Sequence, residues 1–296
     1  MKRSFESDSL TSQEQQQIVE AVAVLPAAEP GKIDRGDRHF ESLCERLGED
    51  LCRRGGIYVI PEGFVLSVVI PIYNEVATVE SVVERMRETG MPLELILVDD
   101  GSTDGTRELL EKMKSDPELT IIMHEQNRGK GAALRTGFNA ASGDVIAIQD
   151  ADLEYDPFEL RYLLQPIVED RADVVYGSRF SGGDDSISPF WHQLACGFLS
   201  KFCNLMTGLK FTDVETCYKL FRRECIQEIA PTLRENRFGI EIEMTSKLSR
   251  RAKKRGTRFF ERPISYDRRS YEEGKKIGWK DGVSAIRCII RYGLFG

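Results

Sequence analysis

The sequence has few of the residues that build metal centres and disulfide frameworks. Its 296 residues include 7 cysteines and only 3 histidines. Because the number of cysteines is odd and no CxxC pair occurs, the pattern predicts neither a zinc site nor a disulfide-stapled fold. We expect free, mostly buried thiols in a reducing compartment, and therefore a cytoplasmic protein.

Long hydrophobic runs are also missing. No 18 consecutive apolar residues occur, because Lys201, Arg287 and Arg291 interrupt the best candidates. The first ten residues, MKRSFESDSL, lack the apolar core of a secretory signal. The sequence therefore predicts neither a transmembrane helix nor a cleaved signal peptide.

Basic residues are in the minority, with 41 Lys and Arg against 48 Asp and Glu and a net charge of −7. Since phosphate backbones attract a surplus of positive charge, this balance argues against a nucleic-acid-binding protein. The charge is unevenly distributed. Residues 247–291 hold 15 Lys and Arg but 5 Asp and Glu, and the rest of the chain has a net charge of −17. An acidic body joined to a basic C-terminal region is predicted.

Three regions differ in composition. Residues 1–64 are first Gln-rich, then small and Pro-containing, then charged with helical spacing. We expect a partly disordered, partly helical extension there, with a possible protein partner. Residues 65–265 alternate short β-branched runs with longer helical patterns, and residues 266–296 form a basic loop and an amphipathic helix. The middle region therefore carries the predicted globular domain.

The alternation in the middle region predicts an α/β fold with a mostly parallel sheet and helices on both faces. Strands are expected over 65–72, 93–98, 119–124, 145–149 and 172–176, with a further one over 257–265. Helices are expected over 75–88, 103–114, 129–141, 157–169, 190–209, 238–254 and 277–294. In such sheets, ligands bind beyond the carboxyl ends of the strands.

Four polar clusters follow the first four predicted strands, at the ends where a site is expected. Asp150 and Asp152 come directly after the fourth strand, and Glu154 follows them. Carboxylate oxygens suit Mg²⁺ or Mn²⁺, which commonly bridge to substrate phosphates. A DxD sequence alone is more typical of a solvated turn than of a metal site, but its position beside three other clusters reverses this preference and favours a metal site.

The second and third clusters provide a tight turn and a basic loop. Asp99 and Asp100 precede Gly101, where the backbone can turn sharply and approach a ligand. A helix-capping turn explains Gly101 but does not explain two adjacent acids after a buried strand. The segment Asn127-Arg-Gly-Lys-Gly lacks P-loop spacing, although Lys130 near a helix N-terminus suits a diphosphate.

The motifs together resemble family 2 glycosyltransferases of the GT-A, Rossmann-like fold, most closely the polyprenyl-phosphate (dolichyl-phosphate) mannosyl- and glucosyltransferases. The resemblance covers residues 65–292 and rests on seven segments in this order: PIYNE, DDGSTDGT, NRGKG, DADLE, YGSRF, TCYKLF and RSYEEGKKIGWKDG. It implies a nucleotide-sugar donor such as GDP-mannose or UDP-glucose, a polyprenyl phosphate acceptor and a divalent metal ion.

The resemblance also implies a role for each matching residue. The nucleoside pocket would be formed by Pro71, Tyr73, Glu75, Asp99 and Asp100, beside Gly101. The metal on the donor diphosphate would be held by Asp150, Asp152 and Glu154. Arg179 would bind the acceptor phosphate, and Arg269 and Lys275 would close over the donor diphosphate.

Two other functions stay open. Transfer to a saccharide or small-molecule hydroxyl would need a general base, for which Asp213 and Glu215 are the candidates. The second open function is that of a non-catalytic regulator that binds a nucleotide sugar. The intact DADLE and RSYEEGKKI segments argue against it.

The last predicted helix suggests a membrane surface as a further partner. On a helical wheel Lys276, Lys280, Arg287 and Arg291 fall within about 60° of one another, beside an apolar stripe that contains Ile286 and Ile290. This pattern fits either a helix on an anionic membrane or a solvated basic face. We expect a peripheral protein at the cytoplasmic membrane face.

Overall fold

The chain divides into two compact units, Met1–Gly63 and Phe64–Gly296. The computed structural model describes residues 11, 13–14, 16–17, 44–180, 190–267 and 279–294. In the first unit, helix α3 spans Glu49–Arg54, and Arg54 forms an ion pair with Glu14, with 2.5 Å between Nη2 and Oε1. Much of the expected N-terminal extension lies outside the described residues.

A seven-stranded sheet forms the centre of the second unit. Its strands lie in the order β3-β2-β1-β4-β6-β5-β7. Six of them run in one direction, and β6 is antiparallel to both of its neighbours, β4 and β5. The strands are β1 Leu66–Ile72, β2 Leu93–Asp99, β3 Leu119–Met123, β4 Val145–Ile148, β5 Val174–Ser178, β6 Lys219–Arg222 and β7 Phe259–Pro263. The predicted mostly parallel sheet is confirmed.

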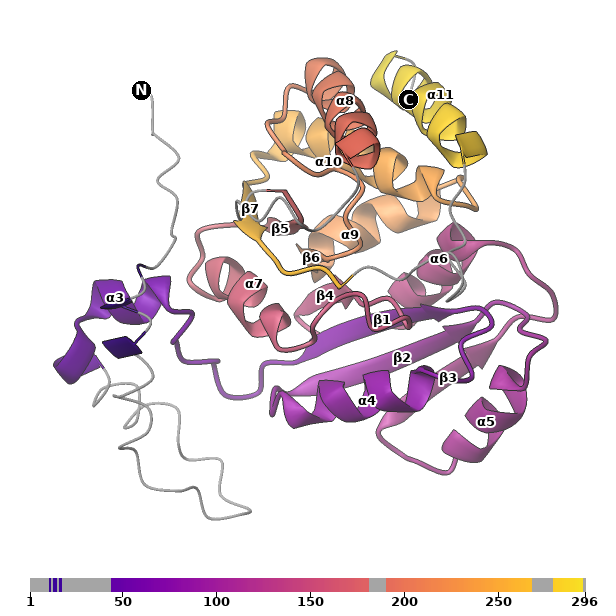
Figure 1. Ribbon diagram of the computed structural model, residues 1–296, viewed down its shortest axis with the longest axis horizontal. Coiled ribbons are helices and arrows are strands. Elements are labelled where there is room, and N and C mark those ends of the chain that lie inside the picture. The colour runs from indigo at the N-terminus through magenta and orange to yellow at the C-terminus, as the bar shows by residue number, and fades with distance from the viewer. Residues whose placement is uncertain are drawn as a thin grey trace. The chain divides into compact units, whose positions relative to one another are not determined.

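Helices cover both faces of this sheet, as predicted (Figure 1). In the view shown, α4 and α5 lie below the sheet, and α6 and α10 lie above it. The helices are α4 Val79–Glu88, α5 Thr106–Met113, α6 Lys130–Ala140, α7 Glu159–Val168, α8 Phe190–Thr207, α9 Arg223–Ile229, α10 Gly239–Arg255 and α11 Trp279–Leu294, with a 3₁₀ turn, η2, at Ala230–Thr232. The core lies between these helices and the apolar strands, of which β4 is buried throughout.

The packing of α6 shows how closely a helix covers the sheet. A Cβ added to Gly137 would collide with the side chain of Val69 on β1. Glycine is therefore required where α6 crosses the central strand. At the other end of the helix, Lys130 lies 2.7 Å from Asp150, directly after β4.

The segment β6-α9-η2 was not predicted. Strand β6 reads KLFR, which is short and begins and ends with a basic residue. Its first residue, Lys219, is fully buried and forms an ion pair with Glu241 of α10. Because this partner lies 22 positions further along the chain, the local sequence pattern gave no sign of a buried strand.

The cysteines and the helices bear on two expectations from composition. All seven cysteines are free thiols, and six of them are buried. Within the residues that the structure describes, no helix has both the length and the hydropathy needed to cross a membrane.

Candidate functional site

A cavity of about 780 Å³ opens at the carboxyl ends of the central strands. It is lined by residues from all four predicted clusters and from the segments around Arg179, Glu215 and Glu241. Ten predicted site residues line it: Pro71, Tyr73, Glu75, Asp100, Lys130, Asp150, Asp152, Glu154, Arg179 and Glu215. The tertiary structure therefore brings most of the predicted residues to one place.

The loop after β1 is locked to the loop after β2. The Asn74 backbone N–H donates to Ser102 Oγ (2.9 Å), and the Thr103 N–H donates to Asn74 Oδ1 (2.8 Å). Asn74 adopts a positive φ of 55°, which asparagine tolerates better than most residues. The Glu75 N–H donates to Thr106 Oγ1 (3.0 Å). These contacts hold the segment from Pro71 to Glu75 against the cavity.

Asp99 does not line the cavity. Its carboxylate is fully buried, accepts hydrogen bonds from the backbone N–H groups of Gly101 and Ser102 (both 3.2 Å), and pairs with Arg107 (3.1 Å). Gly101 has φ +75°, and a Cβ there would lie 2.5 Å from the Asn127 nitrogen. The structure thus places Asp99 and Gly101 in the turn that supports the wall of the cavity.

Asp100 ties the end of β2 to the loop that precedes α6. Its carboxylate accepts hydrogen bonds from the Arg128 N–H (2.9 Å) and the Gly129 N–H (2.6 Å). His124 Nδ1 lies 2.8 Å from the same carboxylate and donates to it. Asp100 is only 2% exposed. It therefore orients the basic loop while lining the cavity.

The acids after β4 have different partners. Asp150 Oδ1 lies 2.7 Å from Lys130 Nζ, and Glu154 Oε2 accepts a hydrogen bond from the Tyr266 hydroxyl (2.6 Å). Burial, together with the charges of Asp150 and Glu154, raises the pKa of Asp152 to about 7. Three carboxyl groups thus crowd one wall of the cavity and compete for positive charge.

The three carboxyl groups of Asp150, Asp152 and Glu154 suit a divalent cation. Hard carboxylate oxygens and an unusually high pKa at Asp152 are the features of a site that gains from a bound cation. Among the described residues, no group of three or more His, Cys, Asp or Glu is arranged to hold a metal ion. The residues fit an ion such as Mg²⁺ or Mn²⁺ that takes one or two ligands from the protein and the others from phosphate and water.

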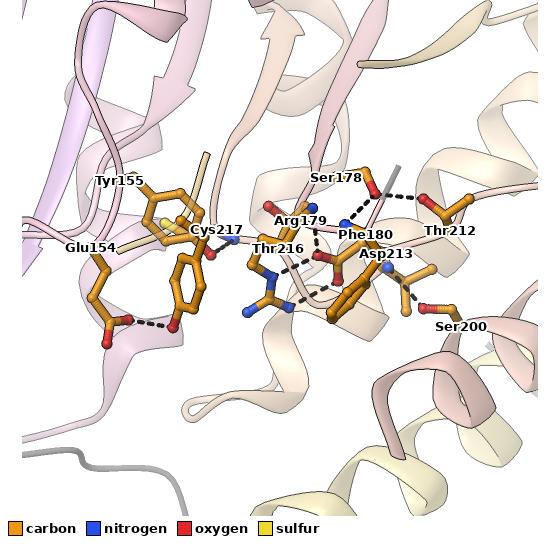
Figure 2. Close-up of polar contacts among 12 residues, drawn as sticks. Glu154, Tyr155, Ser178, Arg179, Phe180, Ser200, Thr212, Asp213, Thr216 and Cys217 are labelled. Atoms are coloured by element: carbon orange, nitrogen blue, oxygen red, sulfur yellow. Dashed lines mark hydrogen bonds and ion pairs between the residues drawn. The ribbon is translucent and has the colours of Figure 1, made fainter. Parts of the chain in front are cut away.

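Arg179 lies beyond the end of β5, held by a buried carboxylate. Its Nε and Nη2 donate to the two oxygens of Asp213 at 2.6 and 2.9 Å, as Figure 2 shows. Burial by itself would lower the pKa of Arg179, but Asp213 holds it well above the ordinary value. The guanidinium also lies over the rings of Phe180 and Tyr266. Arg179 is therefore a fixed cation at the cavity.

Asp213 and Glu215 separate in the structure. Asp213 is fully buried, does not line the cavity and is occupied by Arg179. Glu215 lines the cavity, and burial raises its pKa to about 7, although Arg179 acts to lower it. Of the two candidate bases, only Glu215 lines the cavity, where it could reach a bound hydroxyl group.

Several residues lining the cavity were not predicted. Asn236, Arg237, Phe238 and Glu241 come from the connection between η2 and α10 and from the first turn of that helix. The Gly131 N–H donates to the Asn236 carbonyl (2.8 Å). A Cβ at Gly129 or Gly131 would collide with this connection. The two closely spaced glycines were the one sequence signal that another backbone packs there.

Two aromatic residues were also missed. Tyr155 and Tyr266 line the cavity, with ring centroids 5.2 Å apart. The Tyr155 hydroxyl accepts a hydrogen bond from the Cys217 N–H (3.1 Å; Figure 2). The predicted residues Arg269 and Lys275, which follow Tyr266 in sequence, lie outside the described residues.

The mostly parallel sheet thus carries an acidic cavity at its carboxyl edge. Residues 67–230 match the family described as Glycosyl transferase family 2. The chain belongs to this glycosyltransferase family, as the resemblance of its motifs predicted.

Individual relatives agree with this family. The chain is 36% identical over 167 residues to the undecaprenyl-phosphate 4-deoxy-4-formamido-L-arabinose transferase of Pectobacterium carotovorum, covering 54% of this chain and 50% of that protein. It is 28% identical over 232 residues to the undecaprenyl-phosphate mannosyltransferase of Micrococcus luteus, covering 76% and 93%. The chain thus spans about half the length of the first relative and most of the second.

Solved structures confirm the fold. Glucosyl-3-phosphoglycerate synthase from Mycobacterium tuberculosis with bound UDP has a TM-score of 0.59 at 20% identity, covering 78% of this chain and 80% of that one. The same enzyme with Mn²⁺, UDP-glucose and phosphoglyceric acid has a TM-score of 0.58 at 21% identity, with the same coverage.

Proposed function

We propose that this protein is a metal-dependent, inverting hexosyltransferase. It moves mannose or glucose from a nucleoside diphosphate sugar, GDP-mannose or UDP-glucose, to polyprenyl phosphate. The observation that carries this proposal is that one cavity holds both a group of acids and a fixed cation. A crowded set of carboxylates lines it after β4, and the fixed cation Arg179 lines it after β5.

The carboxylate side suits the donor. One or two of the carboxylates of Asp150, Asp152 and Glu154 would hold Mg²⁺ or Mn²⁺, which would stabilise the negative charge of the departing diphosphate. Lys130 at the start of α6 adds a cation beside them. Pro71, Tyr73, Glu75 and Asp100 line the part of the cavity assigned to the nucleoside.

The Arg179 side suits a phosphate acceptor. A phosphate monoester is ionised near neutral pH, so it can attack the anomeric carbon without a strong general base. Direct in-line attack inverts the anomeric centre. Asp213 orients the guanidinium of Arg179, and Glu261 in turn accepts hydrogen bonds from the N–H groups of Thr212 (2.8 Å) and Asp213 (3.1 Å). Two relatives named as undecaprenyl-phosphate transferases support a polyprenyl phosphate acceptor.

A second candidate function is transfer to a hydroxyl group of a saccharide or small molecule. The observation in its favour is Glu215, a cavity residue whose pKa is raised to about 7 by burial. A group with this pKa can accept a hydroxyl proton near neutral pH. Transfer without lipid phosphate that is lost on Glu215→Gln would favour this function.

The lipid acceptor implies a membrane-facing surface, which we assign to α8 and α11. These two helices contact each other, and Figure 1 shows them side by side. Phe198 and Leu205 of α8 are 57% and 79% exposed, and Ile290 of α11 is 42% exposed. Arg287 and Arg291 are exposed on α11 beside this apolar surface. Apolar and basic side chains together suit the surface of an anionic membrane. With seven free thiols, this surface supports action at the cytoplasmic membrane face.

Incubation of the purified chain with labelled nucleotide sugars, Mn²⁺ and polyprenyl phosphate tests this function. The expected result is a labelled lipid that extracts into butanol with one donor. No extractable product with any donor would refute it.

A further inference from the structure

Lys130 lies between two acids that belong to different parts of the fold. Its Nζ is 2.7 Å from Asp150 Oδ1 after β4 and 3.7 Å from Glu241 Oε1 in the first turn of α10. The Lys130 side chain is only 16% exposed. A buried ammonium group must be neutralised, and here Asp150 makes the closer contact.

Glu241 has one carboxylate oxygen that is occupied and one that is not. Oε2 binds the Nζ of the fully buried Lys219 at 2.5 Å. Oε1 is buried and makes no hydrogen bond within the described part of the chain. Lys130 Nζ faces Oε1 at 3.7 Å, beyond hydrogen-bond distance. Glu241 therefore offers Lys130 a second position that is unfilled in this structure.

Asp150 cannot serve Lys130 and a divalent ion equally. The proposed function assigns Asp150 to the metal on the donor diphosphate, and two cations at one carboxylate repel each other. Lys219, Glu241, Lys130 and Asp150 form a row of alternating charges that balance without any metal. Lys130 thus neutralises Asp150, while Asp152 and Glu154 remain crowded beside it.

We propose that Lys130 is the internal counter-ion of the metal site. It holds Asp150 when the site is empty, and it moves to Glu241 Oε1 and the donor diphosphate when a divalent ion takes Asp150. Displacing Lys130 weakens the binding of the ion alone. A donor diphosphate offsets this cost by accepting hydrogen bonds from Lys130, so that metal and donor bind cooperatively. This inference rests on the proposed function of the site.

The test is a Mn²⁺ titration of the full chain without donor, in which the electron paramagnetic resonance of free Mn²⁺ is measured. Lys130→Met is expected to bind Mn²⁺ at least about tenfold more tightly than the wild type, because Asp150 loses its competing cation. Arg128→Met is the matched control, since it also removes a cation that lines this cavity. Unchanged affinity in Lys130→Met, or an equal gain in Arg128→Met, would overturn the inference.

A second titration measures the cooperativity directly. Adding GDP or UDP should tighten Mn²⁺ binding in the wild type, and this enhancement should fall by about tenfold in Lys130→Met. An equal enhancement in both proteins would contradict the proposal. Lys130→Gln keeps a hydrogen-bond donor without the charge and should behave like Lys130→Met. It replaces that variant if circular dichroism shows that Lys130→Met does not fold.

The titrations measure binding and not sugar transfer, so the two proposals can fail separately. Transfer to polyprenyl phosphate by the wild type, with unchanged Mn²⁺ affinity in Lys130→Met, would overturn only the counter-ion role. Tighter Mn²⁺ binding in Lys130→Met, with no transfer from any donor, would overturn only the lipid transfer.

Discussion

Two pairs of aspartates follow neighbouring parts of one sheet, yet they have opposite surroundings. The carboxylates of Asp99, the last residue of β2, and of the following Asp100 accept hydrogen bonds mainly from backbone N–H groups. Asp150 and Asp152 after β4 lie beside another acid, Glu154, and burial with their mutual repulsion raises the pKa of Asp152 to about 7. The first pair mainly supports the fold, with Asp100 also lining the cavity, and the second is a site that gains from added positive charge.

This difference shows that an acid at a strand end is not sufficient evidence of a ligand site. What distinguishes the two pairs is the donor that meets each carboxylate. Backbone N–H groups are fixed by the fold and are permanent partners. The ammonium of Lys130 on a flexible side chain can exchange with a substrate or an ion. The following variants test this contrast.

The largest effect is expected from Asp152→Asn. We predict that sugar transfer falls by about three orders of magnitude or more, because the leaving diphosphate loses a ligand of its cation. The melting temperature should be unchanged or higher, since one of three crowded charges is removed. Transfer assays and thermal melting measure both. Activity near that of the wild type would refute the metal assignment.

The next effect is expected from Arg179→Lys. The variant keeps the charge but loses the two-pronged contact with Asp213, so kcat/KM for polyprenyl phosphate should fall by about a hundredfold. Arg171→Lys is the control, because Arg171 does not line the cavity. Equal losses in the two variants, or a loss expressed only in the KM of the donor, would contradict an acceptor-phosphate role.

Asp100→Asn should mainly lower the stability of the protein, whereas Asp152→Asn should mainly lower sugar transfer. The neutral side chain accepts hydrogen bonds from Arg128, Gly129 and His124 less strongly, so we expect the free energy of unfolding to fall by about 2 kcal/mol. Urea unfolding of both variants at the same pH measures the difference. If Asp152→Asn loses more stability than Asp100→Asn, the division between support and site is wrong.

The smallest effect concerns Glu159, the first residue of α7. Burial raises its pKa from 4.5 to about 7, although the hydrogen bond from Ser265 lowers it. Since the folded protein holds this proton more tightly than the unfolded chain, stability falls as the pH rises from 4.5 to 7. Glu159→Gln should flatten this part of the profile and add about 1 kcal/mol at pH 7.

The control for this profile is the exposed Glu88→Gln. Unfolding by urea at several pH values compares the two variants with the wild type. A parallel profile for Glu159→Gln and the wild type would show that Glu159 ionises normally in the folded state.

Local sequence was sufficient for most of the fold. Strands such as β1 and β4 are continuous apolar runs, and α4 carries buried residues at helical spacing. Each of these signals is complete within one element. Strand β6 was missed because Lys219 is compatible with burial only in the presence of Glu241, a partner from another element.

Local sequence was also sufficient to predict the outline of the candidate site. Pro71, Asp150 and Arg179 lie at the ends of strands, and the parallel arrangement of those strands brings them together. Glu241 and Asn236 reach the cavity through the packing of α10 and its preceding connection against α6. No spacing along the chain records that approach, apart from Gly129 and Gly131.

The sequence by itself determined the alternation of strands and helices, the parallel sheet and the family, because these depend on periodicity and on motifs read locally. Only the tertiary structure decided the role of each acid. It gave Asp99 and Asp100 to the backbone, Asp213 to Arg179, and Asp150 to Lys130. The charge state and freedom of a carboxylate depend on the donors and charges within a few ångströms of it, and folding brings those together from distant positions.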